Sequence, residues 1–167
     1  MFKQILIAFF LCFCLTLCSR IASADQVAFK YGVGTLLPDQ SSMSVKAFSI
    51  SSQDYLGWGV TEQVELGVFS DIYGEGRESA GFGFYSLGAT VDAEPFRLQA
   101  LWGVGGITNP DNRLGGLLQF TYDMGLSLYN SHSNESIGVG YKHISSAGLS
   151  SPNRGRDFIL MRIGFNF

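Results

Sequence analysis

The feature that most constrains this chain is the alternation of bulky apolar residues with glycine, polar or charged residues. It runs through one segment after another, near residues 27–35, 64–73, 96–104, 118–128, 137–141 and 159–167. Side chains two positions apart in an extended strand point to the same face, so each segment predicts a β-strand with one apolar face. No segment after residue 24 keeps a helical apolar period long enough to predict an amphipathic helix.

Two weaker segments, near 43–52 and 79–91, bring the number of predicted strands to eight. Turn-like clusters lie between strands, for example at 36–42, 74–78 and 109–112. Eight strands can close a small barrel, and a strand that crosses a bilayer needs about 9–11 residues. Residues 25–167 are long enough for eight such strands, so the sequence predicts an all-β fold with a single eight-stranded antiparallel β-barrel domain.

The apolar face of this barrel is predicted to contact lipid. The opposite face has glycines and scattered single charges, at Lys30, Glu65, Asp71, Lys142 and Arg162. Only 15% of the chain is charged, whereas a soluble domain has about 25% charged residues and a surface rich in lysine and glutamate. The aromatic C-terminus, Phe167, is also typical of bacterial outer-membrane barrels. We therefore expect a transmembrane barrel in the bacterial outer membrane, with a water-soluble, lipocalin-like barrel as the alternative.

The N-terminus has the pattern of a secretory signal peptide. Lys3 precedes an apolar run over residues 5–18, and small residues follow at 22–24. As a helix the run would span only about 21 Å, which is short of the roughly 30 Å needed by a membrane anchor. We expect residues 1–24 to be removed by cleavage after Ala24.

A lipidated N-terminus at Cys18 is a minor alternative, because Leu17 is large for the position before a lipoprotein cysteine. Cys12, Cys14 and Cys18 are the three cysteines of the chain, and all lie before the cleavage site. The sequence after residue 24 therefore excludes a disulfide scaffold, a thiol nucleophile and a cysteine-ligated metal site.

Charge and histidine placement exclude further classes. The formal net charge is −3 and basic residues are not clustered, so no nucleic-acid partner is expected. No His, Asp and Glu group has the spacing of metal ligands, and we expect no metal and no cofactor. His132 lies in the turn-like segment 130–134 and is expected to be a solvated turn residue.

One group of polar residues breaks the alternation near the end of the chain. Counting on from Ile137, Val139 and Tyr141 puts His143 and Ser145 on the lipid-facing side of the seventh strand, where polar groups are costly. Counting back from Phe167 puts Asp157 outward at the start of the eighth strand. Antiparallel pairing of these strands would bring the three side chains together near one rim.

A hydroxyl, an imidazole and a carboxylate are the groups that acyl transfer requires. Ser145 would attack an ester carbonyl, His143 would accept and return the proton, and Asp157 would orient and stabilise the imidazolium. The alternative from the pattern alone is that these are rim residues hydrated at the headgroup level.

A longer motif surrounds these residues. It reads His143-x-Ser145-x-Ala147-Gly148-Leu149-x-x-Pro152-Asn153-x-Gly155-x-Asp157. In the last two strands of an exported eight-stranded barrel, this motif resembles the PagL family of outer-membrane lipid A 3-O-deacylases. The resemblance implies a serine-type esterase in which Ser145, His143 and Asp157 are catalytic, with Gly148 and Asn153 supporting the oxyanion.

The motif departs from the family at two positions. Asp157 stands where glutamate is usual, which shortens the side chain by one methylene, and Ser146 stands where asparagine is often found. The resemblance implies lipid A, or lipopolysaccharide, as substrate, outer-membrane lipid as surroundings and hydrolysis of the 3-O-linked 3-hydroxyacyl chain; it leaves a homodimer open. The rival hypothesis is a non-enzymatic small barrel with a structural or adhesive role.

Overall fold

The computed structural model of the chain describes residues 25–34, 43–54, 60–71, 79–108, 114–130, 132–151 and 155–167. The predicted signal peptide lies outside these ranges, as do the turn-like clusters at 36–42, 74–78 and 109–112. The strands are β1 (Gln26–Gly34), β2 (Met43–Asp54), β3 (Val60–Asp71), β4 (Ala80–Ala93), β5 (Phe96–Ile107), β6 (Leu118–Asn130), β7 (Glu135–Ser145) and β8 (Arg156–Asn166).

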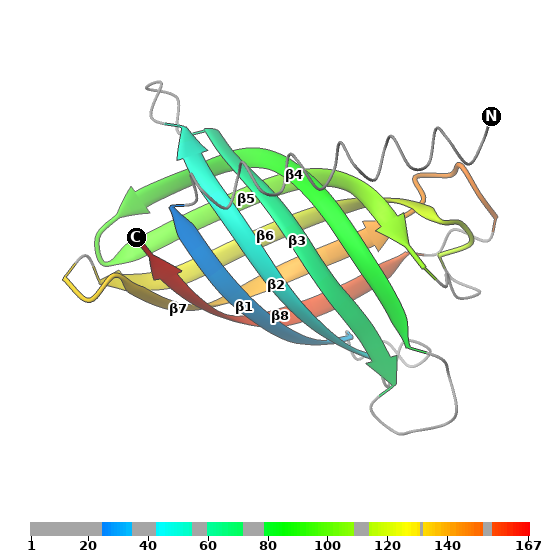
Figure 1. The fold of residues 1–167 in the computed structure, drawn as a ribbon, viewed down its shortest axis with the longest axis horizontal. Coiled ribbons are helices and arrows are strands. Elements are labelled where there is room, and N and C mark those ends of the chain that lie inside the picture. The colour runs from blue at the N-terminus through cyan, green and yellow to red at the C-terminus, as the bar shows by residue number, and fades with distance from the viewer. Residues whose placement is uncertain are drawn as a thin grey trace.

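Each strand pairs antiparallel with the next, and β8 pairs with β1, so the sheet closes on itself (Figure 1). The predicted eight-stranded antiparallel barrel is confirmed. β1 begins and β8 ends at one mouth, and the connection between β7 and β8 lies at the other mouth. Across the described ranges, no helix is long and apolar enough to cross a membrane.

The third strand begins earlier than the segment predicted at 64–73, because the alternation extends back to Val60. Thr61 and Gln63 are buried inside the barrel, while Val60 is exposed on the outside. Ile72 and Tyr73, which the prediction included, lie outside the described residues.

The outer wall of the barrel is apolar. Its exposed side chains include Phe29, Phe48, Leu66, Leu87, Leu98, Trp102, Met124, Leu126, Val139, Ile159, Met161 and Phe165. Such a band suits contact with lipid tails, whereas a soluble barrel would turn these residues inward. The lipocalin-like alternative is therefore wrong.

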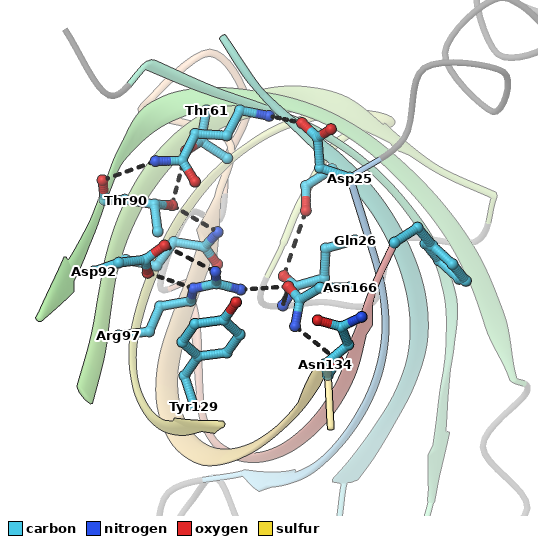
Figure 2. A pocket seen from close by; sticks show the side chains of 13 residues that line it. Asp25, Gln26, Thr61, Thr90, Asp92, Arg97, Tyr129, Asn134 and Asn166 are labelled. Atoms are coloured by element: carbon cyan, nitrogen blue, oxygen red, sulfur yellow. Dashed lines mark hydrogen bonds and ion pairs between the residues drawn. The ribbon is translucent and has the colours of Figure 1, made fainter. Parts of the chain in front are cut away.

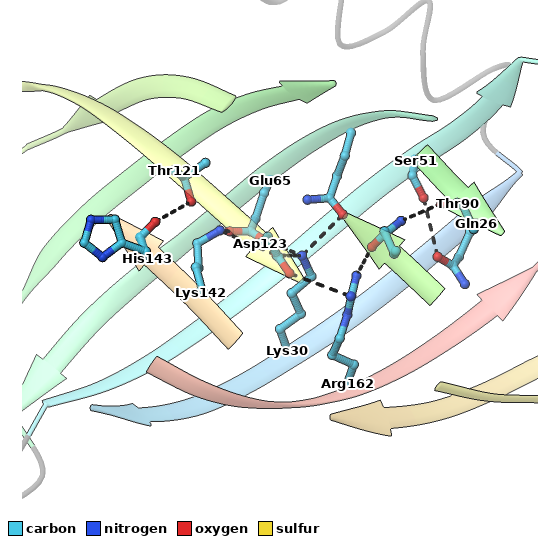
Figure 3. A network of polar contacts seen from close by, with 12 residues as sticks. Gln26, Lys30, Ser51, Glu65, Thr90, Thr121, Asp123, Lys142, His143 and Arg162 are labelled. Atoms are coloured by element: carbon cyan, nitrogen blue, oxygen red, sulfur yellow. Dashed lines mark hydrogen bonds and ion pairs between the residues drawn. The ribbon is translucent and has the colours of Figure 1, made fainter. Parts of the chain in front are cut away.

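The middle of the lumen contains a cluster of buried ion pairs (Figure 3). The Lys30 ammonium lies 2.5 Å from the Glu65 carboxylate and 2.7 Å from Asp123, and the Lys142 ammonium lies 2.6 Å from Glu65. The Arg162 guanidinium donates to the side chain of Gln99. These contacts confirm that the single charges of the sequence face inward, although the side chain of Asp71 lies outside the description.

The lumen near the β7–β8 connection is apolar, which the sequence pattern did not predict. The Phe69 ring stacks on Phe82 and Phe158, with ring centroids 4.5 Å and 5.6 Å apart. Ile144 and Phe158 are fully buried in the same cluster. This part of the core therefore packs directly behind the outward-facing residues of β7 and β8.

The ion-pair cluster gives a prediction about stability. Glu65→Gln removes the carboxylate shared by Lys30 and Lys142 and leaves two buried ammonium groups with one fewer counter-charge. Since breaking a buried ion pair is strongly destabilising, we expect the free energy of unfolding to fall by about 3 kcal/mol or more. Urea-induced unfolding in lipid vesicles measures this change.

The matched control is Glu135→Gln, which removes an exposed carboxylate at the start of β7. Its effect should stay below about 1 kcal/mol. Equal stability of the Glu65→Gln and Glu135→Gln variants would contradict the role of the lumen cluster.

Candidate active site

His143 on β7 and Asp157 on β8 are directly opposite each other in the barrel wall. The imidazole Nδ1 lies 2.8 Å from the carboxylate Oδ1, a hydrogen-bond distance. Their side chains are 37% and 21% exposed, on the outer face. The structure thus brings together two of the three residues predicted from alternation, and the short aspartate side chain reaches the imidazole.

The local packing explains why these side chains point outward. Ile144 follows His143 and Phe158 follows Asp157, and both apolar residues are completely buried in the lumen. Because side chains alternate along a strand, burying these two residues forces their neighbours onto the lipid-facing wall.

Ser145 is the last residue of β7 and lies two positions beyond His143, on the same face. Its cross-strand neighbour on β6 is Phe120. The last printed pair between β7 and β8 is Ile144 with Arg156, so continuing the register by one residue would set Ser145 opposite Gly155.

Gly155 is a site residue whose role the sequence did not disclose. Its φ angle is +66°, and a β-carbon built there would lie 2.7 Å from His143 Cε1 and 3.2 Å from Nε2. A larger residue would therefore collide with the edge of the imidazole. Glycine allows the chain to enter β8 directly beside the ring.

Tyr141 is the second residue that sequence reasoning missed, since alternation marked it only as part of the apolar face. Its hydroxyl donates a hydrogen bond to Asp157 Oδ1, the oxygen that also contacts His143. The available signal was its position, two residues before His143 on the same face of the strand.

The predicted oxyanion residues lie in the β7–β8 connection. Ala147 and Gly148 have φ angles of 50° and 81°, and the Leu149 N–H donates to the Ser146 carbonyl at 2.9 Å. Two successive positive φ angles are typical of a type I′ turn. Gly148 is exposed, with open space where a β-carbon would be, whereas Asn153 lies outside the described residues.

Ser146, the other departure from the family motif, faces away from the outer wall. It is completely buried, and its hydroxyl donates to the Ser150 carbonyl at 3.3 Å. Its side chain therefore packs the turn and does not extend toward His143.

Two aromatic residues lie beside His143 on the two preceding strands of the outer wall. Trp102 on β5 pairs with Tyr122 on β6, which pairs with His143. The centroids of the Trp102 and Tyr122 rings are 5.2 Å apart. The polar site is thus flanked on its β6 side by an aromatic, lipid-facing surface.

A separate polar cavity of about 230 Å³ opens at the mouth where β1 begins (Figure 2). Arg97 lines this cavity, where it forms an ion pair with Asp92 at 2.6 Å and donates a hydrogen bond to the Asn166 side chain at 2.6 Å. The described residues that line it include no histidine or cysteine. A nucleophile activated by an imidazole is therefore better supported at His143 than at this mouth.

In the part of the chain that the structure describes, no group of three or more His, Cys, Asp or Glu side chains could hold a metal ion. His132 lies in an exposed turn, and its N–H donates to the Asn130 side chain at 2.9 Å. The chemistry that the site does support is proton transfer by an imidazole whose Nδ1 is held by a carboxylate.

The fold is that of an outer-membrane β-barrel, and the candidate site lies on its lipid-facing wall. A family model described as lipid A 3-O-deacylase (PagL) matches residues 42–166, most of the barrel. The chain belongs to this family, and it is an outer-membrane protein. A curated relative, lipid A deacylase PagL of Bordetella bronchiseptica, is 37% identical over 57 residues, which are 34% of this chain and 32% of the relative.

Solved structures with the same fold have low sequence identity to the chain. The crystal structure of the outer-membrane enzyme PagL has a TM-score of 0.62 at 18% identity, covering 85% of this chain and 99% of that one. The N-terminal β-barrel domain of Pseudomonas aeruginosa OprF has a TM-score of 0.53 at 14% identity, covering 86% and 98%. The Yersinia pestis protein Ail has a TM-score of 0.52 at 14% identity, covering 85% and 97%. The barrel alone does not define a function.

The contact between Gly155 and the imidazole gives a prediction. Gly155→Ala should displace the His143 ring, because its β-carbon would lie within 2.7 Å of Cε1. The imidazole ¹⁵N and ¹H signals of His143 in labelled protein should therefore move, while those of His132 stay as a reference.

Gly148→Ala is the matched control. It also replaces a glycine with positive φ, so the backbone strain is of the same kind, but its β-carbon meets nothing within 4 Å. Unchanged His143 signals in Gly155→Ala, or equal changes in both variants, would contradict this packing.

Proposed function

We propose that the protein hydrolyses the ester-linked 3-hydroxyacyl chain at the 3-position of lipid A, with Ser145, His143 and Asp157 as a catalytic triad. The main support is the 2.8 Å contact between the His143 imidazole and the Asp157 carboxylate on the lipid-facing wall. Charged and polar groups are costly on a lipid-facing wall, so their presence there points to a function. Membership of the lipid A 3-O-deacylase family supplies the reaction and the position of the ester.

The first half of the reaction forms an acyl-enzyme. Asp157 accepts the Nδ1–H of His143, which leaves Nε2 to accept the Ser145 proton. The Ser145 Oγ attacks the ester carbonyl carbon and forms a tetrahedral intermediate. As the ester C–O bond breaks, the imidazolium returns its proton to the departing 3-oxygen of the sugar.

The second half releases the fatty acid. A water molecule gives a proton to His143 Nε2 and attacks the acyl carbon, and the Ser145 oxygen leaves with that proton. One ester and one water are thereby converted into one alcohol and one 3-hydroxy fatty acid. Throughout, Asp157 holds the ring and stabilises its positive form.

The developing oxyanion requires nearby hydrogen-bond donors. We assign this role to the connection after Ser145, with the Gly148 N–H and the Asn153 side chain as donors. The assignment rests on the family motif and on the type I′ turn that exposes Gly148.

The location of the site suits a substrate that remains in the membrane. A lipid can approach sideways within the leaflet, with its sugar at the rim beside Ser145 and its acyl chains along the apolar wall. Phe120 beside Ser145 and Tyr122 beside His143 provide the adjoining surface on β6. No channel through the packed lumen is needed for this route.

Loss of the nucleophile or the base should abolish turnover. We expect Ser145→Ala and His143→Ala each to lower the deacylation rate by about 10³-fold or more, and the double variant to be scarcely worse, because the members of a triad act as a unit. Mass spectrometry of lipid A incubated with the folded protein in detergent measures the loss of one 3-hydroxyacyl group.

Asp92→Asn is the matched control, since Asp92 pairs with Arg97 at the opposite mouth of the barrel. It should keep the wild-type rate. Deacylation that survives Ser145→Ala would refute the nucleophile assignment, and an inert wild-type protein would favour the non-enzymatic barrel.

A further inference from the structure

Tyr141 contacts the catalytic acid from the side away from the nucleophile. Its hydroxyl donates to Asp157 Oδ1, and the same oxygen lies 2.8 Å from His143 Nδ1. Both donors come from β7, whereas the carboxylate is on β8. One carboxylate oxygen is therefore fixed by two hydrogen bonds from the neighbouring strand.

The register of the barrel makes this contact a diagonal one. Tyr141 is directly opposite Ile159, and Asp157 is two positions back along β8, opposite His143. Diagonal neighbours on one face of a sheet are about 7–8 Å apart, which aromatic side chains can span. A tyrosine at this position has the length to reach the carboxylate.

The apolar surroundings of Tyr141 make its hydrogen bond important for the Asp157 carboxylate. The direct neighbours of Tyr141 are Met124 on β6 and Ile159 on β8, and both are exposed on the apolar wall. A carboxylate facing lipid has few water molecules to satisfy it, so a protein donor replaces part of its hydration. Two donors on Oδ1 also restrict rotation of the short Asp157 side chain.

We infer that Tyr141 is a positioning residue for the catalytic acid: its hydroxyl fixes the Asp157 carboxylate and, through it, the orientation of the His143 imidazole. This inference rests on the proposed deacylase function. A hydrogen-bond partner of a group that holds a reacting residue helps to fix the orientation of that residue, as outer hydrogen-bond partners do for metal-binding histidines. Tyr141 does not contact the reacting atoms, so it acts through Asp157.

Tyr141→Phe tests the inference, because it removes the hydroxyl and keeps the ring. We expect kcat for lipid A deacylation to fall about tenfold or more, as for loss of a hydrogen bond to a charged group. KM should stay within about twofold, since the hydroxyl does not bind substrate.

A double-mutant cycle separates positioning from a general structural role. In an Asp157→Ala background, Tyr141→Phe should cause less than about twofold further loss, because the oxygen that accepts the hydrogen bond from the hydroxyl is already gone. Tyr31→Phe is the control, because Tyr31 is another tyrosine of the outer wall, exposed and on β1. It should match wild type.

A measurement without substrate distinguishes this inference from the proposed function. The Nδ1–H proton signal of His143 should be observed in the wild type and in Tyr31→Phe, and should broaden or shift in Tyr141→Phe. If the wild type deacylates and Tyr141→Phe retains kcat, or lowers kcat by the same factor in the Asp157→Ala background, the inference is overturned. If the wild type is inert, deacylation fails as the function, and an unchanged Nδ1–H signal in Tyr141→Phe overturns the positioning role as well.

Discussion

The site depends on the fixed register of β7 and β8 between a packed lumen and lipid. Ile144 and Phe158 are completely buried in the lumen, so their neighbours along each strand must face outward. A slip of one residue would turn the imidazole and the carboxylate into an aromatic core and expose the core residues to lipid. Barrel closure strengthens this constraint, because every strand is paired on both sides and no edge is free to shift.

The barrel separates two kinds of polar chemistry. Inside, lysines, an arginine and carboxylates pair with one another in the buried cluster around Glu65 and Asp123. Outside, the polar groups of the site satisfy each other through His143, Asp157 and Tyr141. The inner cluster contributes to the stability of the fold. The outer group lies on a lipid-facing wall, where apolar side chains would cost less free energy than polar ones. This contrast is the physical reason to assign function to the outer group.

Much of this arrangement could be predicted from the sequence, because alternation is a local signal. The strand number, the inward charges such as Lys30 and Arg162, and the shared face of His143 and Asp157 follow from counting by twos. Contacts between side chains on different strands could not be predicted from the alternation. The stacking of Phe69 on Phe158, the Tyr141 hydroxyl on Asp157 and the approach of Gly155 to the imidazole all require the register between distant segments. The role of Asn153 stays a prediction of the family motif.

The proposed function depends on Ser145 acting as a nucleophile that His143 activates on the lipid-facing wall. Its most direct test is mass spectrometry of the bilayer-embedded protein after exposure to a long-chain alkyl fluorophosphonate, which reacts with activated serines. We expect one phosphonyl adduct per chain, located by peptide mapping at Ser145 and absent from the His143→Ala variant. An adduct at another residue, or unmodified Ser145 in a preparation that deacylates lipid A, would contradict it.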